Sequence, residues 1–342
     1  MTITTIGIDL AKNVFQIHGV DGSGKTVLKK QLRRNQVLTY FIKLTTCTIG
    51  IEACGGAHYW ARKLRAMGHT VKLMAPQFVK PYVKANKTDA ADAEAICEAV
   101  TRPNMRFVAI KNVEQQAILS LHRARQGFVK ARTAQANQIR GLLGEYGITI
   151  PQGIKYVMKD MLKLLDPPEH DLPGAFTDLL KRLHTHLLVL EEQVSDLETQ
   201  INSWHSNNEY SQRLSKIPGI GPLTATALVA SIADANCFRN GRELAAWLGL
   251  VPRQHSSGGR PILLGISKRG DTYLRTLLIH GARSAVRVAK NKSSPTDKWT
   301  NEMLNRRHQN VASVARANKN ARIVWALLAH GRDYNAEYKI AA

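Results

Sequence analysis

Residues 3–110 alternate between short β-branched apolar runs and longer amphipathic runs. Three apolar runs, ITTIGIDLA, VFQIHGV and TVLKKQL, are separated by turn residues and predict three strands joined by hairpins. The later runs predict a helix at NQVLTYFIKL, a strand at CTIGIEA, a helix at HYWARKLRAM and a strand at HTVKLMAP. Hairpin-linked strands followed by strand–helix crossovers predict a mixed sheet with helices on its faces, which is the outline of a ribonuclease-H-like fold.

A phosphate-loop pattern, GVDGSGKT at residues 19–26, suggests a competing interpretation of this region. Its glycines and lysine would cradle nucleotide phosphates if the segment opened a helix. The residues that follow are TVLKKQL, which begins with β-formers, and Asp21-Gly22 and Ser23-Gly24 are hairpin turn signals. We therefore predict a turn between two strands and no nucleotide site.

Between residues 111 and 210 the apolar positions recur every three to four residues, which is typical of long amphipathic helices. One stretch ends near Gly144, and a second begins after a proline-rich loop that closes at Pro173. The two helices can form an antiparallel pair or an intermolecular coiled coil, and the sequence does not decide between them. If the contact is intermolecular, changing Leu187 and Val194 should cost oligomerisation before it costs folding.

The last third opens with a glycine-rich turn, Ile217-Pro-Gly-Ile-Gly-Pro, in front of an apolar helix. This matches the helix-hairpin-helix pattern, in which glycines let the backbone amides at a helix start approach a phosphate. Lys216, Gly219 and Gly221 are therefore candidate contacts to a nucleic-acid backbone. A simple connector between helices is the alternative.

Ser256 and Ser257 lie in a second turn, VPRQHSSGGR, among cations. A small loop that presents a hydroxyl beside cations suits a serine that attacks a phosphodiester, because the cations stabilise charge on the phosphoryl oxygens. A solvent-exposed turn without chemistry is the alternative. The candidate nucleic-acid-binding cations in this part of the chain are Arg253, Arg260, Lys268, Arg269 and Arg275.

The charge of the chain indicates a polyanionic partner. Its 342 residues carry a formal net charge of +22, divided as +7 in residues 1–100, +1 in 101–210 and +14 in 211–342. The last third is therefore the segment we expect to lie along a nucleic-acid backbone. No run approaches the roughly 18 apolar residues of a membrane span, so we expect a soluble protein that stays inside the cell and has no membrane partner.

The cysteines add no chemistry of their own. Cys47, Cys54, Cys97 and Cys237 show neither a disulfide framework nor metal-ligand spacing. We expect them to be thiols of the hydrophobic core.

Four acidic residues in the first hundred positions carry the candidate chemistry. Asp9 and Glu52 end two of the predicted strands, and Asp89 and Asp92, three residues apart, share one helix face. Each has an ordinary explanation: polar strand ends for the first two, and helix capping or a favourable dipole for the pair. Together they would repel one another unless a hard cation neutralised them. Mg²⁺, for which Mn²⁺ can substitute, is the usual solution, so the four predict a metal-dependent phosphodiester site.

Six pieces of the chain resemble the DEDD transposases of bacterial insertion sequences, family one-hundred-and-ten and particularly its eleven-eleven subgroup, the RNA-guided bridge recombinases. They are GIDLAKNVF, IGIEACGGAHYWA, KTDAADAEAICEAV, IPGIGPLTA, LVPRQHSSGG and ISKRGDTYLR, in the family's order and spread over essentially the whole chain. The resemblance implies an α/β domain followed by helical regions. These are a RuvC-like catalytic domain at 1–110, a coiled-coil region at 111–210 and a mostly helical C-terminal transposase domain with a helix-hairpin-helix motif at 211–342.

The resemblance also implies a mechanism. The family's nucleophilic serine precedes a glycine after a Pro-Arg-x-x-x stretch, a place that Ser257 occupies, with Ser256 as the fallback. It further implies a metal-binding quartet made of Asp9, Glu52, Asp89 and Asp92. A structured guide RNA encoded by the element, donor and target DNA, a homodimer or homotetramer, and a bacterial cytoplasmic location are implied as well.

Two other functions would use the same residues. A RuvC-like structure-selective nuclease would use the acidic quartet with water as the nucleophile and would not need Ser257. A non-catalytic nucleic-acid-binding protein would need only the basic last third and the glycine hairpin. Covalent attachment of protein to DNA separates them: a recombinase forms it, a nuclease leaves free ends, and a binding protein cuts nothing.

Overall fold

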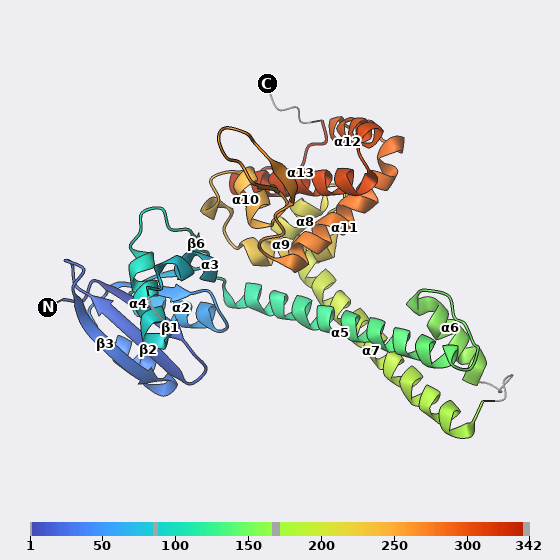
Figure 1. Cartoon of the computed structure of the whole chain (residues 1–342), viewed down its shortest axis with the longest axis horizontal. Helices are drawn as coiled ribbons and strands as arrows, with labels where there is room; N and C mark the ends of the chain where they lie inside the picture. Colours follow the sequence, from blue (N-terminus) through green and yellow to red (C-terminus); the bar gives the residue numbers. More distant parts are fainter. Residues whose placement is uncertain (1, 85–87, 166–171, 338–342) are drawn as a thin grey trace. The chain divides into compact units, whose positions relative to one another are not determined.

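The computed structural model divides into two compact units (Figure 1). The residues that it describes are 2–84, 88–165 and 172–337. Unit 1 comprises Met1–Gln115 and Ile232–Arg239, and unit 2 comprises Gln116–Ser231 and Asn240–Ala342. The domain boundaries at residues 110 and 210 stay predictions. Within the described ranges, no helix combines the length and the apolar character that a membrane crossing requires.

Unit 1 is built on a six-stranded sheet. Its strands are β1 (Thr5–Leu10), β2 (Val14–Val20), β3 (Thr26–Arg33), β4 (Thr48–Glu52), β5 (Thr70–Met74) and β6 (Phe107–Val108). They lie in the order β3-β2-β1-β4-β5-β6. The first three form an antiparallel meander, β4 pairs parallel with β1 and with β5, and β6 closes the sheet antiparallel to β5. The mixed sheet with helices on its faces confirms the predicted ribonuclease-H-like architecture, to which β6 is an unpredicted addition.

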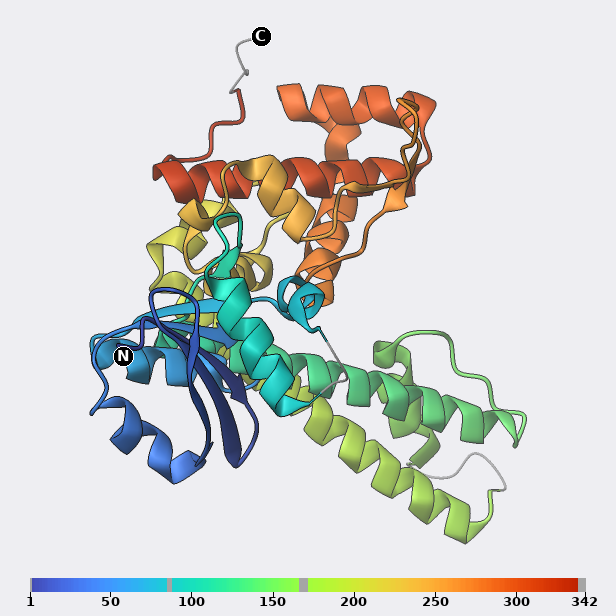
Figure 2. The same cartoon turned by 60° about the vertical axis from the view of Figure 1, so that its left-hand side comes forward.

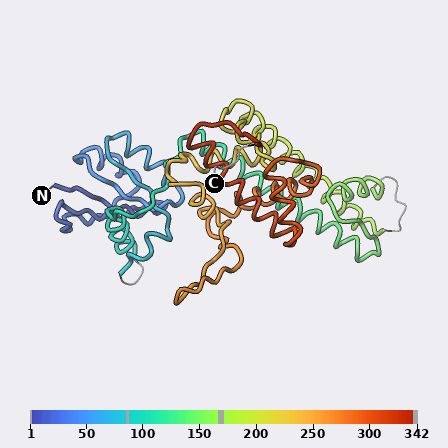
Figure 3. The backbone as a smooth tube through the Cα atoms, turned by 90° about the horizontal axis from the view of Figure 1, so that it is seen from above, coloured from blue at the N-terminus to red at the C-terminus, as the bar shows by residue number. Residues whose placement is uncertain are grey.

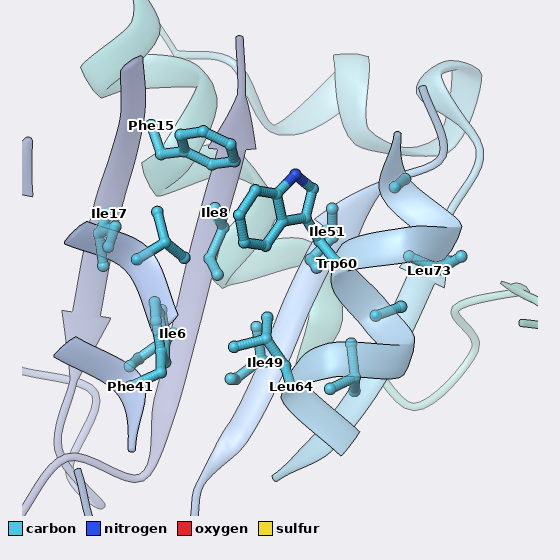
Figure 4. Close-up of a cluster of buried hydrophobic side chains, with 14 of the residues drawn as sticks. Ile6, Ile8, Phe15, Ile17, Phe41, Ile49, Ile51, Trp60, Leu64 and Leu73 are labelled. Carbon is cyan, nitrogen blue, oxygen red and sulfur yellow. The ribbon is translucent and has the colours of Figure 1, made fainter. Parts of the chain in front are cut away.

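Helices cover both faces of this sheet. They are α1 (Val37–Phe41), α2 (Ala57–Ala66), α3 (Pro76–Val79) and α4 (Asp89–Val100), with 3-10 turns at Arg34–Gln36, Lys80–Tyr82 and Ala235–Cys237. The main core lies beneath α1 and α2, where Ile8 of β1 and Ile51 of β4 are fully buried (Figure 4). Trp60 of α2 packs edge-on against Phe15 with ring centres 4.9 Å apart. This apolar layer fixes the register of the central strands, because a one-residue slip would turn these side chains to the opposite face, where α4 packs too closely to admit them.

Helix α4 lies directly on the opposite face because two strand glycines leave room for it (Figure 2). A methyl group at Gly7 would lie 2.2 Å from the carbonyl oxygen of Ala93 and 2.4 Å from the amide nitrogen of Cys97. One at Gly50 would lie 2.8 Å from Cβ of Val100. Glycine otherwise weakens a strand interior, so these two positions mark the close approach of helix and sheet.

The GVDGSGKT segment is a β-hairpin. Its first residue belongs to β2 and its last begins β3, so no helix follows it. The carboxylate of Asp21 accepts hydrogen bonds from the amides of Ser23 (2.9 Å) and Lys25 (3.0 Å), which closes the turn. The predicted turn is confirmed.

The described part of unit 2 is helical apart from one small hairpin. Its helices are α5 (Val113–Gly144, which starts in unit 1), α6 (Ile154–Leu165), α7 (Gly174–Ser206), α8 (Glu209–Ser215), α9 (Pro222–Ile232), α10 (Gly241–Trp247), α11 (Thr272–Val288), α12 (Pro295–Arg306) and α13 (Gln309–His330). The hairpin is formed by β7 (Pro252–Gln254) and β8 (Leu263–Ile266), and a 3-10 turn spans Ala289–Asn291. The mostly helical C-terminal region is therefore confirmed.

The two predicted long helices, α5 and α7, pair within the chain. Two ion pairs join them: Arg125 with Glu198, and Arg132 with Glu191. Their reversed order shows that the helices run antiparallel. Leu187 and Val194 are buried inside the chain, which favours the pair within one chain and a cost in folding when they are changed. Their effect on oligomerisation stays a prediction. Helix α6 was not predicted; it follows the breakers Pro151 and Gly153 and buries an apolar stripe of its own.

The cysteines divide into two groups. Cys47 and Cys97 are buried thiols, as expected. Cys54 and Cys237 are exposed, so the expectation that all four belong to the core was wrong for these two.

Candidate functional site

Asp9 is the last residue but one of β1, and Glu52 is the last residue of its parallel neighbour β4. β1 and β4 pair in register up to the residues just before them, so the two acids follow side by side. Each lies two positions after a glycine that contacts α4, Gly7 and Gly50 respectively. Because alternate residues of a strand share a face, both carboxylates belong to the face that α4 covers.

Helix α4 brings its acidic first turn towards the same end of the sheet. It runs antiparallel to β1, because Ala93 lies over Gly7 and, one turn later, the Cys97 thiol donates to the carbonyl oxygen of Thr5 at 3.7 Å. The turn before Ala93, which carries Asp92, therefore lies towards the C-terminal end of β1. Asp9 stands at that end.

Thr88 caps this helix. Its hydroxyl accepts a hydrogen bond from the Ala91 amide at 3.2 Å. The capping explanation for Asp89 and Asp92 is thus wrong, but both lie in the first turn, where the helix dipole favours negative charge.

The thiol of Cys54 lies in the negative potential at this edge of the sheet. The pKa of its thiol is raised, first by partial burial of the sulfur and then by the negative charges of Glu52 and Asp9. Both carboxylates therefore lie within electrostatic reach of one point just beyond β4.

The donor set suits a hard divalent cation. Asp9, Glu52, Asp89 and Asp92 offer only carboxylate oxygens, which Mg²⁺ and Mn²⁺ accept as ligands. Within the part of the chain that the structure describes, no three Asp, Glu, His or Cys side chains lie close enough to enclose a metal ion. The structure thus directs the acids to one edge of the sheet without closing them into a site.

Ser256 and Ser257 lie at the tip of the β7–β8 hairpin, which extends away from the helices of unit 2 (Figure 3, orange). The Ser256 oxygen accepts hydrogen bonds from Gln254 Nε2 (2.7 Å) and from the Ile262 amide (3.4 Å). The Ser257 hydroxyl is exposed and makes no hydrogen bond with any described residue. Ser256 therefore stabilises the turn, whereas Ser257 is available to a reactant.

The cations around the hairpin differ in availability. Arg253, Arg260, Lys268 and Arg269 are exposed. Arg275 is buried, and its Nη1 donates to the carbonyl oxygens of Leu248 (3.2 Å) and Arg269 (3.0 Å). It fixes the turn that precedes α11, so we remove Arg275 from the candidate nucleic-acid contacts.

A glycine turn joins α8 to α9, in line with the helix-hairpin-helix pattern. Gly219 has a φ of +91° and packs so tightly that a methyl group would lie 2.6 Å from the Gly281 carbonyl oxygen, so packing explains this glycine. Gly221 faces open space directly before α9. Lys216 Nζ lies 3.1 Å from Asp333 Oδ1. Gly219 thus has a packing role and Lys216 an ion pair, whereas Gly221 has neither; its carbonyl oxygen accepts the first hydrogen bond of α9, from the Ala225 amide at 2.9 Å.

Two glycines that let α4 approach the strands of Asp9 and Glu52 were not predicted. Gly7 and Gly50 stand between isoleucines in the two strands that end in Asp9 and Glu52. A glycine inside a β-branched run was the available signal, because it marks close approach of another backbone.

Comparison with known proteins covers both units. A family model described as a transposase matches residues 6–148, and the model of the transposase IS116/IS110/IS902 family matches residues 211–296. A probable family 20 transposase from Pseudomonas aeruginosa is 53% identical over 335 residues, which are 98% of this chain and 99% of that protein.

Two further relatives extend this result. The transposase for insertion sequence element IS1111A from Coxiella burnetii is 45% identical over 97% of this chain and 91% of its own length. The transposase for insertion sequence element IS1328 from Yersinia enterocolitica is 44% identical over 96% of this chain and 98% of its own length. The chain therefore belongs to the IS116/IS110/IS902 family of insertion-sequence transposases.

Proposed function

We propose that this transposase cleaves and rejoins DNA through a covalent link between Ser257 and a DNA phosphate. The supporting observation is the contrast within the hairpin. The Ser257 hydroxyl, which follows Arg253 and precedes Arg260 in the sequence, is exposed and makes no hydrogen bond within the described residues, while Ser256 is held in the turn.

The proposed cleavage is a phosphoryl transfer to Ser257. Oγ of Ser257 attacks phosphorus, a P–Oγ bond forms, and one P–O bond to a deoxyribose breaks. The serine proton passes to a base, and the departing deoxyribose oxygen takes up a proton. Arg253 and Arg260 would stabilise the extra charge on the phosphoryl oxygens, and a second strand end can later attack the phosphoserine to rejoin the DNA.

Asp9, Glu52, Asp89 and Asp92 would hold a divalent cation for this chemistry, Mg²⁺ or Mn²⁺. Such an ion, when bound, polarises a phosphoryl oxygen or lowers the pKa of a coordinated hydroxyl. The fold supplies two carboxylates from adjacent strands and two from a helix start whose dipole favours negative charge. Ion binding would have to draw the four together.

DNA is the partner that membership of a transposase family implies. The same proposal includes donor and target DNA as substrates and a structured RNA, encoded by the element, as the guide. It also includes a homodimer or homotetramer that acts in the bacterial cytoplasm. The net charge of +14 in residues 211–342 supports extensive contact with a phosphate backbone. Exposed Lys268 and Arg269, and the open backbone at Gly221, are the proposed contacts besides the hairpin cations.

The test is a recombination assay between donor and target plasmids, with the flanking DNA of the element transcribed alongside. Wild type and Ser256→Ala should both yield protein-linked DNA, whereas Ser257→Ala should yield none. Asp9→Asn should yield no cleavage, because the ion site is incomplete. Free cut ends from Ser257→Ala would contradict the proposal and favour the nuclease with water as nucleophile.

A further inference from the structure

Unit 2 contains a groove that the proposed chemistry does not use. It encloses about 1480 Å³ and is lined by α13, the start of α12 and the base of the β7–β8 hairpin. Sites for single small molecules measure roughly 300–1,000 Å³, so this groove suits a longer ligand. Pro252 and Leu264 bring its lining to within a few residues of Ser257.

The cations of the groove lack acidic partners. They are Arg242 of α10, Lys319 and Arg322 of α13, and Arg332. None of the four forms an ion pair with a carboxylate of residues 2–84, 88–165 or 172–337. The acid among the lining residues, Asp333, pairs with Lys216, which does not line the groove. The groove is therefore complementary to an anion.

Positive charge is also crowded there. The pKa of Lys319 is lowered by burial and by the charges of Arg316 and Arg322. Arg316 is balanced by the buried carboxylate of Asp297, 3.2 Å from its Nη1, but Lys319 and Arg322 are not balanced. An anionic ligand would relieve the repulsion between these two side chains.

Aromatic rings stand among these cations. Trp299 of α12 and Trp325 of α13 line the groove, and Lys319 Nζ lies 4.6 Å from the centre of the Trp299 ring. Aromatic faces beside cations form the platform on which unpaired bases stack while their phosphates are neutralised. Bases of an intact duplex are stacked on one another and cannot use such a platform.

We infer that this groove binds an unpaired segment of DNA and leads it to the hairpin that carries Ser257. The inference rests on the proposed function, because strand cleavage by a transposase is what exposes unpaired DNA. Trp299 and Trp325 would stack on bases, and Arg242 and Arg322 would contact phosphates. It assigns to this groove a role in DNA handling distinct from that of the glycine turn before α9.

Binding of labelled oligonucleotides to the full-length protein in EDTA tests this assignment. Fluorescence anisotropy would compare a single-stranded DNA, its duplex and an RNA of the same sequence. Trp299→Leu should lower affinity for the single strand about tenfold, the effect of losing a stacked base. Arg322→Ala should also weaken that binding, and both should change duplex affinity no more than Lys298→Ala, which removes an exposed cation beside Trp299 but outside the groove.

Several outcomes would overturn the inference. If Trp299→Leu and Arg322→Ala bind the single strand as tightly as Lys298→Ala does, the groove is not used. Tighter binding of RNA would assign the groove to RNA, and a changed oligomeric state of Trp299→Leu in light scattering would assign it to a second copy of the chain.

Photo-crosslinking with the wild-type protein keeps the test valid if Trp299→Leu fails to fold. A single-stranded DNA containing iodouracil should crosslink to Trp299 or Trp325, and crosslinks confined to other segments would contradict the assignment. The two proposals can fail separately. Intact Ser257 adducts without groove crosslinks would overturn only this inference, whereas groove crosslinks without adducts would overturn only the covalent mechanism.

Discussion

The acidic edge of unit 1 and the serine hairpin of unit 2 hold their reactive groups in opposite ways. Asp9 and Glu52 follow fully buried strand residues, and α4 lies in backbone contact with β1. In the hairpin, every residue from 252 to 265 is exposed. We infer that folding alone places the strand acids, whereas Ser257 takes its final position on bound DNA, as expected of a reactive loop carried by a rigid frame.

The largest expected effect comes from a methyl group added under α4. Gly7→Ala should lower the free energy of unfolding of unit 1 by about 3 kcal/mol or more, because the methyl would lie 2.2 Å from a backbone oxygen. The same change in the hairpin, Gly258→Ala, meets no atom within 4 Å and should cost about 1 kcal/mol, from its φ of +55°. Urea unfolding followed by circular dichroism measures both. Equal losses of unfolding free energy in Gly7→Ala and Gly258→Ala would contradict the contrast between the rigid acidic edge and the exposed hairpin.

The stability of the helices that carry the hairpin should depend on pH through one buried histidine. His122 is buried between Tyr273 and Thr226, and burial, with the nearby Arg125, lowers its pKa from 6.5 to about 4. The neutral ring therefore stabilises the fold above pH 6.5, and that stability is lost as the pH falls from 6.5 towards 4. The loss should reach about 3 kcal/mol for unit 2.

Unfolding measured across this pH range should show the loss in wild type and a flatter curve in His122→Gln. The pKa of His18 in unit 1 is lowered as well, so both proteins retain that common contribution. Parallel curves for the two proteins would contradict the assignment to His122.

Stabilisation by the metal ion should be smaller than the effects of Gly7→Ala and of His122. Mn²⁺ at tenfold its Kd should raise the free energy of unfolding by about 1.4 kcal/mol in wild type and in Ser257→Ala, because the ion binds the folded acidic edge. Asp9→Asn should lose this increment, whereas Asp178→Asn, which removes an exposed acid of α7, should keep it. Thermal melts with and without Mn²⁺ measure it. An equal increment in Asp9→Asn would place the ion elsewhere.

The sequence predicted the elements that carry the acidic residues, because strand and helix periodicities determine where these residues lie, whereas the metal site itself stays a prediction. β-branched runs ending in Asp9 and Glu52 predicted two strands that end in an acid, and the three-residue spacing of Asp89 and Asp92 predicted one helix face. That the two strands are adjacent and parallel came from the structure. The closeness of α4 to the sheet was not predicted, because it depends on which backbone crosses Gly7. Capping by Thr88 was not predicted either, because threonine and aspartate are both good N-cap residues and the sequence does not show which of them caps the helix.

The hairpin and its surroundings were less predictable. Ser256 and Ser257 are chemically identical in the sequence, and only the hydrogen bonds of the folded turn distinguish them. Arginine side chains usually lie at the surface, but that of Arg275 is buried against backbone carbonyl oxygens. The cations and rings of the groove come from α10, α12 and α13, so no local motif could have indicated them.

Mass spectrometry of the trapped protein–DNA adduct tests the central claim most directly. The wild-type protein, denatured during recombination and digested with nuclease and trypsin, should carry a nucleotide phosphate on Ser257, in the peptide that begins at Gln254. An adduct on Ser256 or on any other residue, or cleaved DNA without an adduct, would contradict the assignment of Ser257 as the nucleophile.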